Sequence, residues 1–260
     1  MRRFVSVKTF VVPVIFFAAL CAPGFGYTVL WDTSHGVADV ANGGGYQPSG
    51  HYSDLTDHLE DNDFTVNTTT LGFTENYLAN TDVAVVCITS AFSSSYSAAE
   101  ATLLADFVNN GGGLLILGTN PSLGNGNIQP VAGKFGITLA ASGDDTYSGN
   151  YTPEDLNHPV FASFTATDHI YMPAAGEIEV DGNAFALAQI TENIFIAGAN
   201  YGTGRVVALG DFNMFSQEGN FFALAQNSEF ALNTFEWLAV PEPATILLMA
   251  VGAALLRRKR

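Results

Sequence analysis

The chain has 260 residues, 48% of them hydrophobic, with nine Lys and Arg against 25 Asp and Glu and a formal net charge of −16. Seven of the nine basic residues stand within the first eight or the last four positions, so residues 27–239 carry 24 acidic residues against only Lys134 and Arg205. This balance excludes nucleic acid binding, which needs clustered Lys and Arg against phosphates. It suits salty surroundings, divalent cations or cationic partners, and equally a protein kept soluble by self-repulsion.

The first 26 residues have the layout of a secretory signal peptide. Three basic residues within the first eight positions precede an apolar stretch from Phe10 to Leu20, and small, turn-prone residues follow as far as Gly26. We therefore predict a signal peptide over residues 1–26 and export of the rest of the chain.

The first half of the body alternates strand-like and helix-like segments. A helix over 53–61 is expected with Ser53 as its N-cap, and Ser97 and Glu100 form a capping box that opens a second helix. The buried apolar runs expected as strands are 27–31, 64–66, 83–88 and 114–117. Strands that alternate with helices and are apolar throughout favour a parallel sheet covered on both faces.

The second half is less regular. We expect a polar, turn-rich segment over 144–157 and two or three antiparallel strands at one sheet edge over 178–196. A strand is expected over 204–211, with Asp211 at its carboxyl end, and a helix with an apolar stripe closes the body. Residues 27–239, long enough for one domain with a sizeable core, are therefore predicted to form one α/β domain, a flavodoxin-like three-layer sandwich with a mostly parallel sheet.

The tail has three parts in a fixed order: a Pro-Glu-Pro box, an apolar run from Ala244 to Leu256, and four basic residues. This order resembles the PEP-CTERM sorting tail, which in that family is recognised and processed by an exosortase in the inner membrane of Gram-negative bacteria. The apolar run of 13 residues gives about 20 Å of helix against a hydrocarbon core of about 30 Å, so a transmembrane helix needs snorkelling flanks or a thinned bilayer. The residues of this signal are Pro241, Glu242, Pro243, Arg257, Arg258, Lys259 and Arg260.

The sorting tail, over residues 240–260, implies a location and a partner. The resemblance implies a chain anchored in the inner membrane, with a periplasmic body, until an exosortase processes it. After processing, the expected final location is the cell surface or the extracellular matrix.

Three passages of the body resemble the class I glutamine amidotransferase-like superfamily. They are Val29–Gly36, Phe107–Asn120 and the stretch from Gly204 to Phe215 with the helix after it. The nearest branch holds the GIFT domains of gliding-motility and intraflagellar-transport proteins, together with ThuA-like proteins. The resemblance implies a flavodoxin-like fold.

The catalytic cysteine of that superfamily has no counterpart here. In the catalytic members the nucleophile stands in a sharp turn after a strand, whereas the turn after Leu117 reads Gly118-Thr119-Asn120-Pro121. Cys87, the one thiol of the body, lies in an apolar run where a thiolate would be poorly solvated. Glutamine hydrolysis is therefore not expected.

Polar residues after the strands predict a ligand cleft. The loops at the carboxyl ends of parallel strands line the crevice of such a sheet. Asp32, three residues before His35, could orient that imidazole for acid–base work or for binding, although each residue also fits a cap or turn. The expected members are Asp32, Ser34, His35, Ser90, Thr119, Asn120, Asp211 and Asn213.

Metal motifs are absent from the sequence. The five histidines form neither H-E-x-x-H nor a pair with cysteine, so no metal and no cofactor is expected. Calcium on the turns 61–63 and 144–145 is the open alternative.

Three functions remain open. The main hypothesis is an exported, non-catalytic domain that binds exopolysaccharide, another ligand or an envelope protein. The alternative is a hydrolase of polysaccharides or esters that uses Asp32 with His35, or Asp211. The third is a structural component of the matrix.

Overall fold

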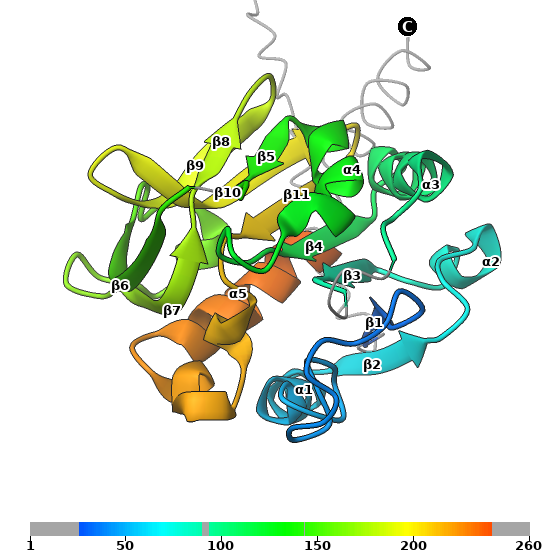
Figure 1. The fold of residues 1–260 in the computed structure, drawn as a ribbon, viewed down its shortest axis with the longest axis horizontal. Coiled ribbons are helices and arrows are strands. Elements are labelled where there is room, and N and C mark those ends of the chain that lie inside the picture. Colours follow the sequence, from blue (N-terminus) through cyan, green and yellow to red (C-terminus); the bar gives the residue numbers. More distant parts are fainter. Residues whose placement is uncertain (1–25, 90–93, 143, 241–260) are drawn as a thin grey trace, which may run out of the picture.

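A block of five parallel strands forms one half of the sheet in the computed structural model, which describes residues 26–89, 94–142 and 144–240 (Figure 1). Their order, β2-β1-β3-β4-β11, is that of flavodoxin-like folds. β3 and β4 are buried at every position, as expected for strands covered on both faces. The strands are β1 (Tyr27–Asp32), β2 (Phe64–Thr69), β3 (Val83–Cys87), β4 (Gly113–Leu117) and β11 (Gly204–Leu209).

An antiparallel extension makes the sheet mixed, so the prediction of a mostly parallel sheet is wrong. β10, β9, β6 and β7 follow β11 in that order, while β8 pairs with both β10 and β5. The antiparallel strands expected over 178–196 are confirmed. The six strands are β5 (Ile137–Leu139), β6 (Thr146–Pro153), β7 (Ile170–Gly176), β8 (Ile178–Val180), β9 (Ala184–Ile190) and β10 (Asn193–Tyr201).

β6 was not expected, because its sequence is polar. Only Tyr151 of this strand is buried, and the other positions are exposed or half-buried. Burial alternates along the strand, but only Tyr147 and Tyr151 pack on Phe195 and the remaining residues are small or polar, so residues 144–157 resemble a turn-rich loop in sequence alone.

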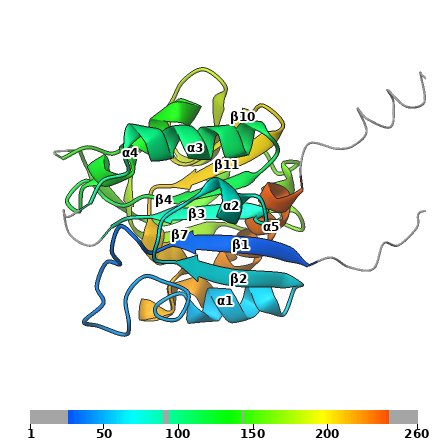
Figure 2. The same cartoon turned by 90° about the vertical axis from the view of Figure 1, so that its right-hand side faces the viewer.

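Helices cover both faces of the sheet. Figure 2 looks onto α2 and α3, with α5 behind the strands. α3 begins with the predicted Ser97–Glu100 capping box. The prediction of Ser53 as an N-cap is wrong: Tyr52 holds that position, and the Ser53 hydroxyl donates to Gln217 instead. The helices are α1 (Ser53–Glu60), α2 (Glu75–Leu78), α3 (Ala98–Asn109), α4 (Gln129–Ala132) and α5 (Asn227–Ala239).

Short 3-10 helices complete the chain. They are η1 (Asn125–Asn127), η2 (Gly133–Phe135), η3 (Pro159–Phe161), η4 (Phe212–Phe215) and η5 (Glu218–Ala223). Among the described residues, every helix is too short or too polar to span a bilayer. The predicted signal peptide, apart from Gly26, and the sorting tail after Val240 lie outside the described residues.

The core lies between the sheet and its helices. Trp31 of β1 packs on Tyr52, and Phe64 of β2 packs on Phe235 of α5. Because β1, β3, β4 and β11 run parallel, their carboxyl ends meet at one edge, where the loops with the predicted site residues lie.

Candidate functional site

Asp32 closes β1, and neighbouring groups engage both oxygens of its carboxylate. Oδ1 accepts the backbone N–H of Ser34 at 2.8 Å. Oδ2 lies 2.7 Å from Nδ1 of His35 and accepts the Tyr96 hydroxyl at 2.6 Å. Burial, and then the nearby Asp32 carboxylate, hold the pKa of Tyr96 well above its usual range, so the phenol stays protonated and donates.

The imidazole of His35 is enclosed on both nitrogens and on one face. Nε2 lies 3.2 Å from Oε1 of Glu100, and the ring stacks on Tyr96 with 3.9 Å between the ring centroids. The Ser34 hydroxyl is 3.0 Å from Nδ1, but the Asp32 carboxylate is closer to the same nitrogen and requires a proton on it. Nδ1 therefore cannot act as a base toward Ser34 in this arrangement.

Glu100 connects this site to helix α3. Its Oε2 accepts the N–H and the hydroxyl of Ser97 at 2.8 and 2.7 Å, which completes the capping box. Burial acts to raise the pKa of Glu100, but the hydrogen bonds from Ser97 and the neighbouring His35 outweigh it and lower that pKa. Glu100 is thus held as a carboxylate opposite the imidazole. The sequence predicted only its part in the capping box.

Asp211 follows β11 and is fully buried. Its Oδ1 accepts the backbone N–H and the side-chain amide of Asn213 at 2.9 and 3.0 Å, and Oδ2 accepts the N–H of Ala174 at 2.6 Å. Burial raises the pKa of Asp211 from 3.8 to about 6, and these hydrogen bonds only partly offset the lost hydration. Asp32 and Asp211 thus have separate sets of partners.

Thr119 and Asn120 belong to a tight loop after β4. The N–H of Thr119 donates to Oδ1 of Asn125 at 2.8 Å, and the Asn125 amide donates back to the Thr119 carbonyl at 2.9 Å. Oδ1 of Asn120 accepts the N–H of Ser122 at 3.0 Å. Both residues therefore shape the turn, as the turn-former interpretation expected. Ser90 lies outside the described residues.

A hollow of about 340 Å³ lies among the loops at this edge of the sheet. Of the predicted site residues that the structure describes, Asn213 alone lines it. An apolar and aromatic wall with a few polar groups is typical of small-molecule sites. The lining residues are Ala38, Asp39, Tyr46, Ile88, Thr89, Leu123, Phe212 and Asn213.

Tyr46 organises the polar side of this hollow. Its hydroxyl lies 2.7 Å from Oδ1 of Asn213 and also contacts the Glu218 carboxylate. Burial, and then the hydrogen bond with Glu218, raise the pKa of Tyr46, so the hydroxyl remains a donor.

The sequence interpretation missed Asp39, Tyr46 and Thr89. Asp39 and Tyr46 lie away from the strand end, in the long loop after β1, which folds back so that the N–H of Tyr46 donates to the carbonyl of Ala38. The loop's glycine content, from Asn42 to Gly50, was the available signal that it makes tight turns. Thr89 directly follows the strand expected over 83–88, but the prediction chose its neighbour Ser90 instead.

The turns suggested for calcium differ from each other. Asn62 donates to the His58 carbonyl and continues the end of α1. Asp144 and Asp145 line a second hollow, of about 590 Å³, together with Glu177 and Glu179. Burial, and then the surrounding carboxylates, raise the pKa of Glu177, which indicates that the carboxylates of this hollow repel one another.

Comparison with known proteins identifies the tail and the fold. A model described as the PEP-CTERM protein-sorting motif matches residues 239–260, so the chain carries the sorting signal of an exported, exosortase-targeted protein that is membrane-anchored before processing. Comparison with curated protein sequences gives no match.

Solved structures confirm the predicted resemblance of the body. The mmIFT52 N-terminal domain is similar with a TM-score of 0.66 and 17% identity over 82% of this chain and 97% of that domain. A putative ThuA-like protein from Bacteroides uniformis is similar with a TM-score of 0.54 and 16% identity, over 85% of this chain and 95% of that protein. A cytoplasmic protein from Salmonella typhimurium is similar with a TM-score of 0.60 and 15% identity, over 84% of this chain and 100% of that protein. At these identities the likeness establishes the fold alone.

Proposed function

We propose that this chain is an exported, non-catalytic binding protein of the cell envelope or extracellular matrix, and that the hollow at the carboxyl edge of the sheet holds its ligand. The observation that carries this proposal is the contrast between two neighbouring regions. The acid–base groups, Asp32 and His35, are engaged in contacts with one another, with Tyr96 and with Glu100. The hollow beside Asn213 combines apolar walls with hydroxyl, amide and carboxylate groups.

The lining favours a ligand rich in hydroxyl groups. Thr89, Asn213 and Asp39 offer donors and acceptors, while the largely buried rings of Tyr46 and Phe212 form part of the apolar wall. Exopolysaccharide fits both this chemistry and the export that the sorting motif implies.

Binding tests this proposal directly. The full-length chain, purified in mild detergent, is titrated with oligosaccharides from the exopolysaccharide of a Gram-negative host that has a cognate exosortase. Leu123 lines the hollow and is 47% exposed, so Leu123→Asp should weaken binding at least tenfold and leave the fold intact. Leu156→Asp is the matched control, because Leu156 is 38% exposed and does not line the hollow. Equal oligosaccharide affinity in both variants and in wild type would refute the proposal that the hollow is the binding site.

The hydrolase alternative predicts a different result. Purified protein would turn over acyl esters or p-nitrophenyl glycosides, and an Asp32→Asn, His35→Ala double variant that retains its circular dichroism spectrum would lose that turnover.

A further inference from the structure

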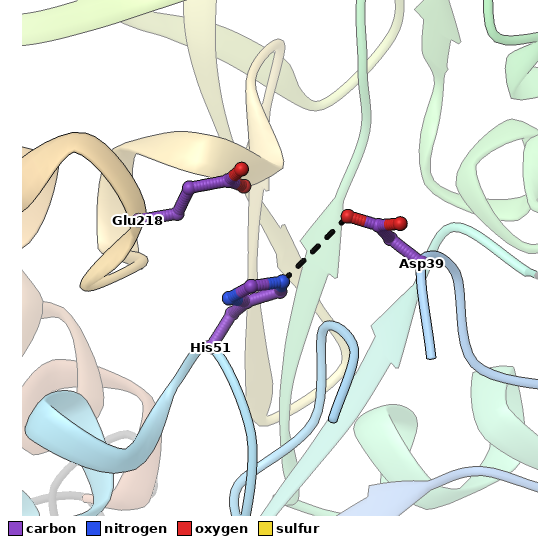
Figure 3. Close-up of side chains that lie close together, drawn as sticks. All are labelled: Asp39, His51 and Glu218. Carbon is purple, nitrogen blue, oxygen red and sulfur yellow. Dashed lines mark ion pairs between the residues drawn. The ribbon is translucent and has the colours of Figure 1, made fainter. Parts of the chain in front are cut away.

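A cluster of three metal-ligating side chains lies beside the hollow, outside the predicted site. Asp39 and His51 come from the loop between β1 and α1, and Glu218 opens η5 after β11. One ligand atom from each residue lies within 4.8 Å of the other two. Figure 3 shows the three side chains pointing toward one another from opposite sides. No other group of this kind occurs among the described residues.

The imidazole of His51 is buried and its Nε2 has no hydrogen-bond partner among the described residues. The side chain is 8% exposed, and Nε2 points toward Asp39, 3.7 Å from its Oδ2, which is too far for a hydrogen bond. Buried polar atoms without a partner are rare in folded proteins, and each one calls for a specific explanation. A cation between the imidazole and the two carboxylates would supply the missing partner.

The separations suit a small ion. Zinc bonds to histidine nitrogen and carboxylate oxygen are about 2.0–2.2 Å long, which places neighbouring ligands of a tetrahedral ion about 3.3–3.5 Å apart. The 3.7 Å separation of Nε2 and Oδ2 is close to this value, and a Glu218 carboxylate oxygen lies within 4.8 Å of both other ligand atoms.

The donor set indicates the class of metal. One imidazole nitrogen with two carboxylate oxygens suits zinc and similar transition ions, whereas calcium and magnesium prefer oxygen ligands throughout. Asp39 and Glu218 are exposed, so a bound ion would keep coordination positions open to water or to a ligand.

Neighbouring groups hold the proposed ligands in place. The ring of Tyr46 packs against His51 with 4.6 Å between centroids, and its hydroxyl contacts the Glu218 carboxylate. Gly43 has a φ of +60°, and a Cβ there would lie 2.7 Å from Cε1 of His51, so glycine allows this close packing. Such outer contacts orient ligands at metal sites.

The two Lys and Arg residues of the body each make a hydrogen bond outside this cluster. Lys134 donates to Thr102 and Arg205 donates to the Trp237 carbonyl, and these are the two Lys or Arg residues between 27 and 239. We propose that Asp39, His51 and Glu218 bind one divalent transition-metal ion of the zinc class, which ties the loop after β1 to the segment after β11. This proposal does not depend on the proposed function.

Metal titration tests the site. The full-length chain in mild detergent is stripped with a chelator and titrated calorimetrically with ZnCl₂ and, separately, with CaCl₂. We expect one equivalent of zinc to bind at least tenfold more tightly than calcium. Asp39→Asn and Glu218→Gln should each weaken zinc binding at least tenfold, and both residues are exposed, so the fold should persist. Cobalt in place of zinc should give a visible absorption band that His51→Gln abolishes.

Matched variants separate a built site from general attraction to an acidic surface. Asp54→Asn, Glu75→Gln and His169→Gln make the same chemical changes elsewhere and should leave zinc binding unchanged. Zinc binding no tighter than calcium binding, or equal affinity in the cluster variants and in these controls, would overturn the proposal.

Discussion

Nδ1 of His35 lies 2.7 Å from Oδ2 of Asp32, so the pair expected from sequence does form. The structure adds Glu100, whose Oε1 lies 3.2 Å from the other ring nitrogen. The imidazole thereby connects the end of β1 to the first turn of α3, the geometry of a buried structural contact.

His35→Ala should therefore reduce stability. The substitution leaves the Asp32 carboxylate buried with fewer donors, and we expect the free energy of unfolding to fall by about 1–3 kcal/mol. Urea unfolding followed by circular dichroism measures this. His169→Ala, at a partly exposed position, should change stability by less than about 0.5 kcal/mol. An unchanged unfolding curve for His35→Ala would contradict the structural role.

Asp211 should make stability depend on pH between about 4 and 6. Its pKa is raised from 3.8 to about 6 by burial, so the folded state holds the proton more tightly than the unfolded state. The resulting stabilisation is fully present below the unfolded pKa and is lost as pH rises through the folded pKa; it amounts to no more than about 3 kcal/mol.

The comparison with Asp211→Asn isolates that contribution. The stability of wild type relative to the variant should be greatest near pH 4 and should fall as pH rises toward 7. Urea unfolding at several pH values measures this difference. A difference that does not vary with pH would show that Asp211 titrates normally in the folded protein.

The acidic hollow should respond to charge removal and to salt. Glu177 faces Glu179, Asp144 and Asp145, and its raised pKa means that its contribution to stability is lost as pH rises through that pKa. At pH 7 and low salt, Glu177→Gln should raise the Tm by roughly 1 °C, an effect that screening at about 0.5 M salt should reduce. Glu192→Gln, at an exposed position, is the control. An equal gain in both variants would point to net charge alone.

The sorting box should govern location. Replacing Pro241-Glu242-Pro243 with three alanines should leave the chain uncleaved in the inner membrane of a host with a cognate exosortase, because the recognised box is gone while the apolar run remains. Cell fractionation and immunoblotting measure this. Release of the variant into the medium at the wild-type level would refute the assignment.

Local patterns in the sequence were enough for the parallel block, the α3 capping box and the sorting tail. A continuous apolar run such as Val83–Cys87 predicts by itself a strand covered on both faces, and a capping box is complete within four residues. β6 was not predicted because only two of its side chains, Tyr147 and Tyr151, pack on the core, and the strands that pair with it lie far away in the sequence.

The site shows the same division between local and distant contacts. Asp32 and His35 are three residues apart, so the sequence itself determined that they could pair. Glu100 reaches His35 only through the packing of α3, and Glu218 reaches His51 only because the segment after β11 packs against the loop after β1. Convergence of residues so distant in sequence depends on how elements pack in three dimensions, which side-chain periodicity does not encode, so only the tertiary structure decided it.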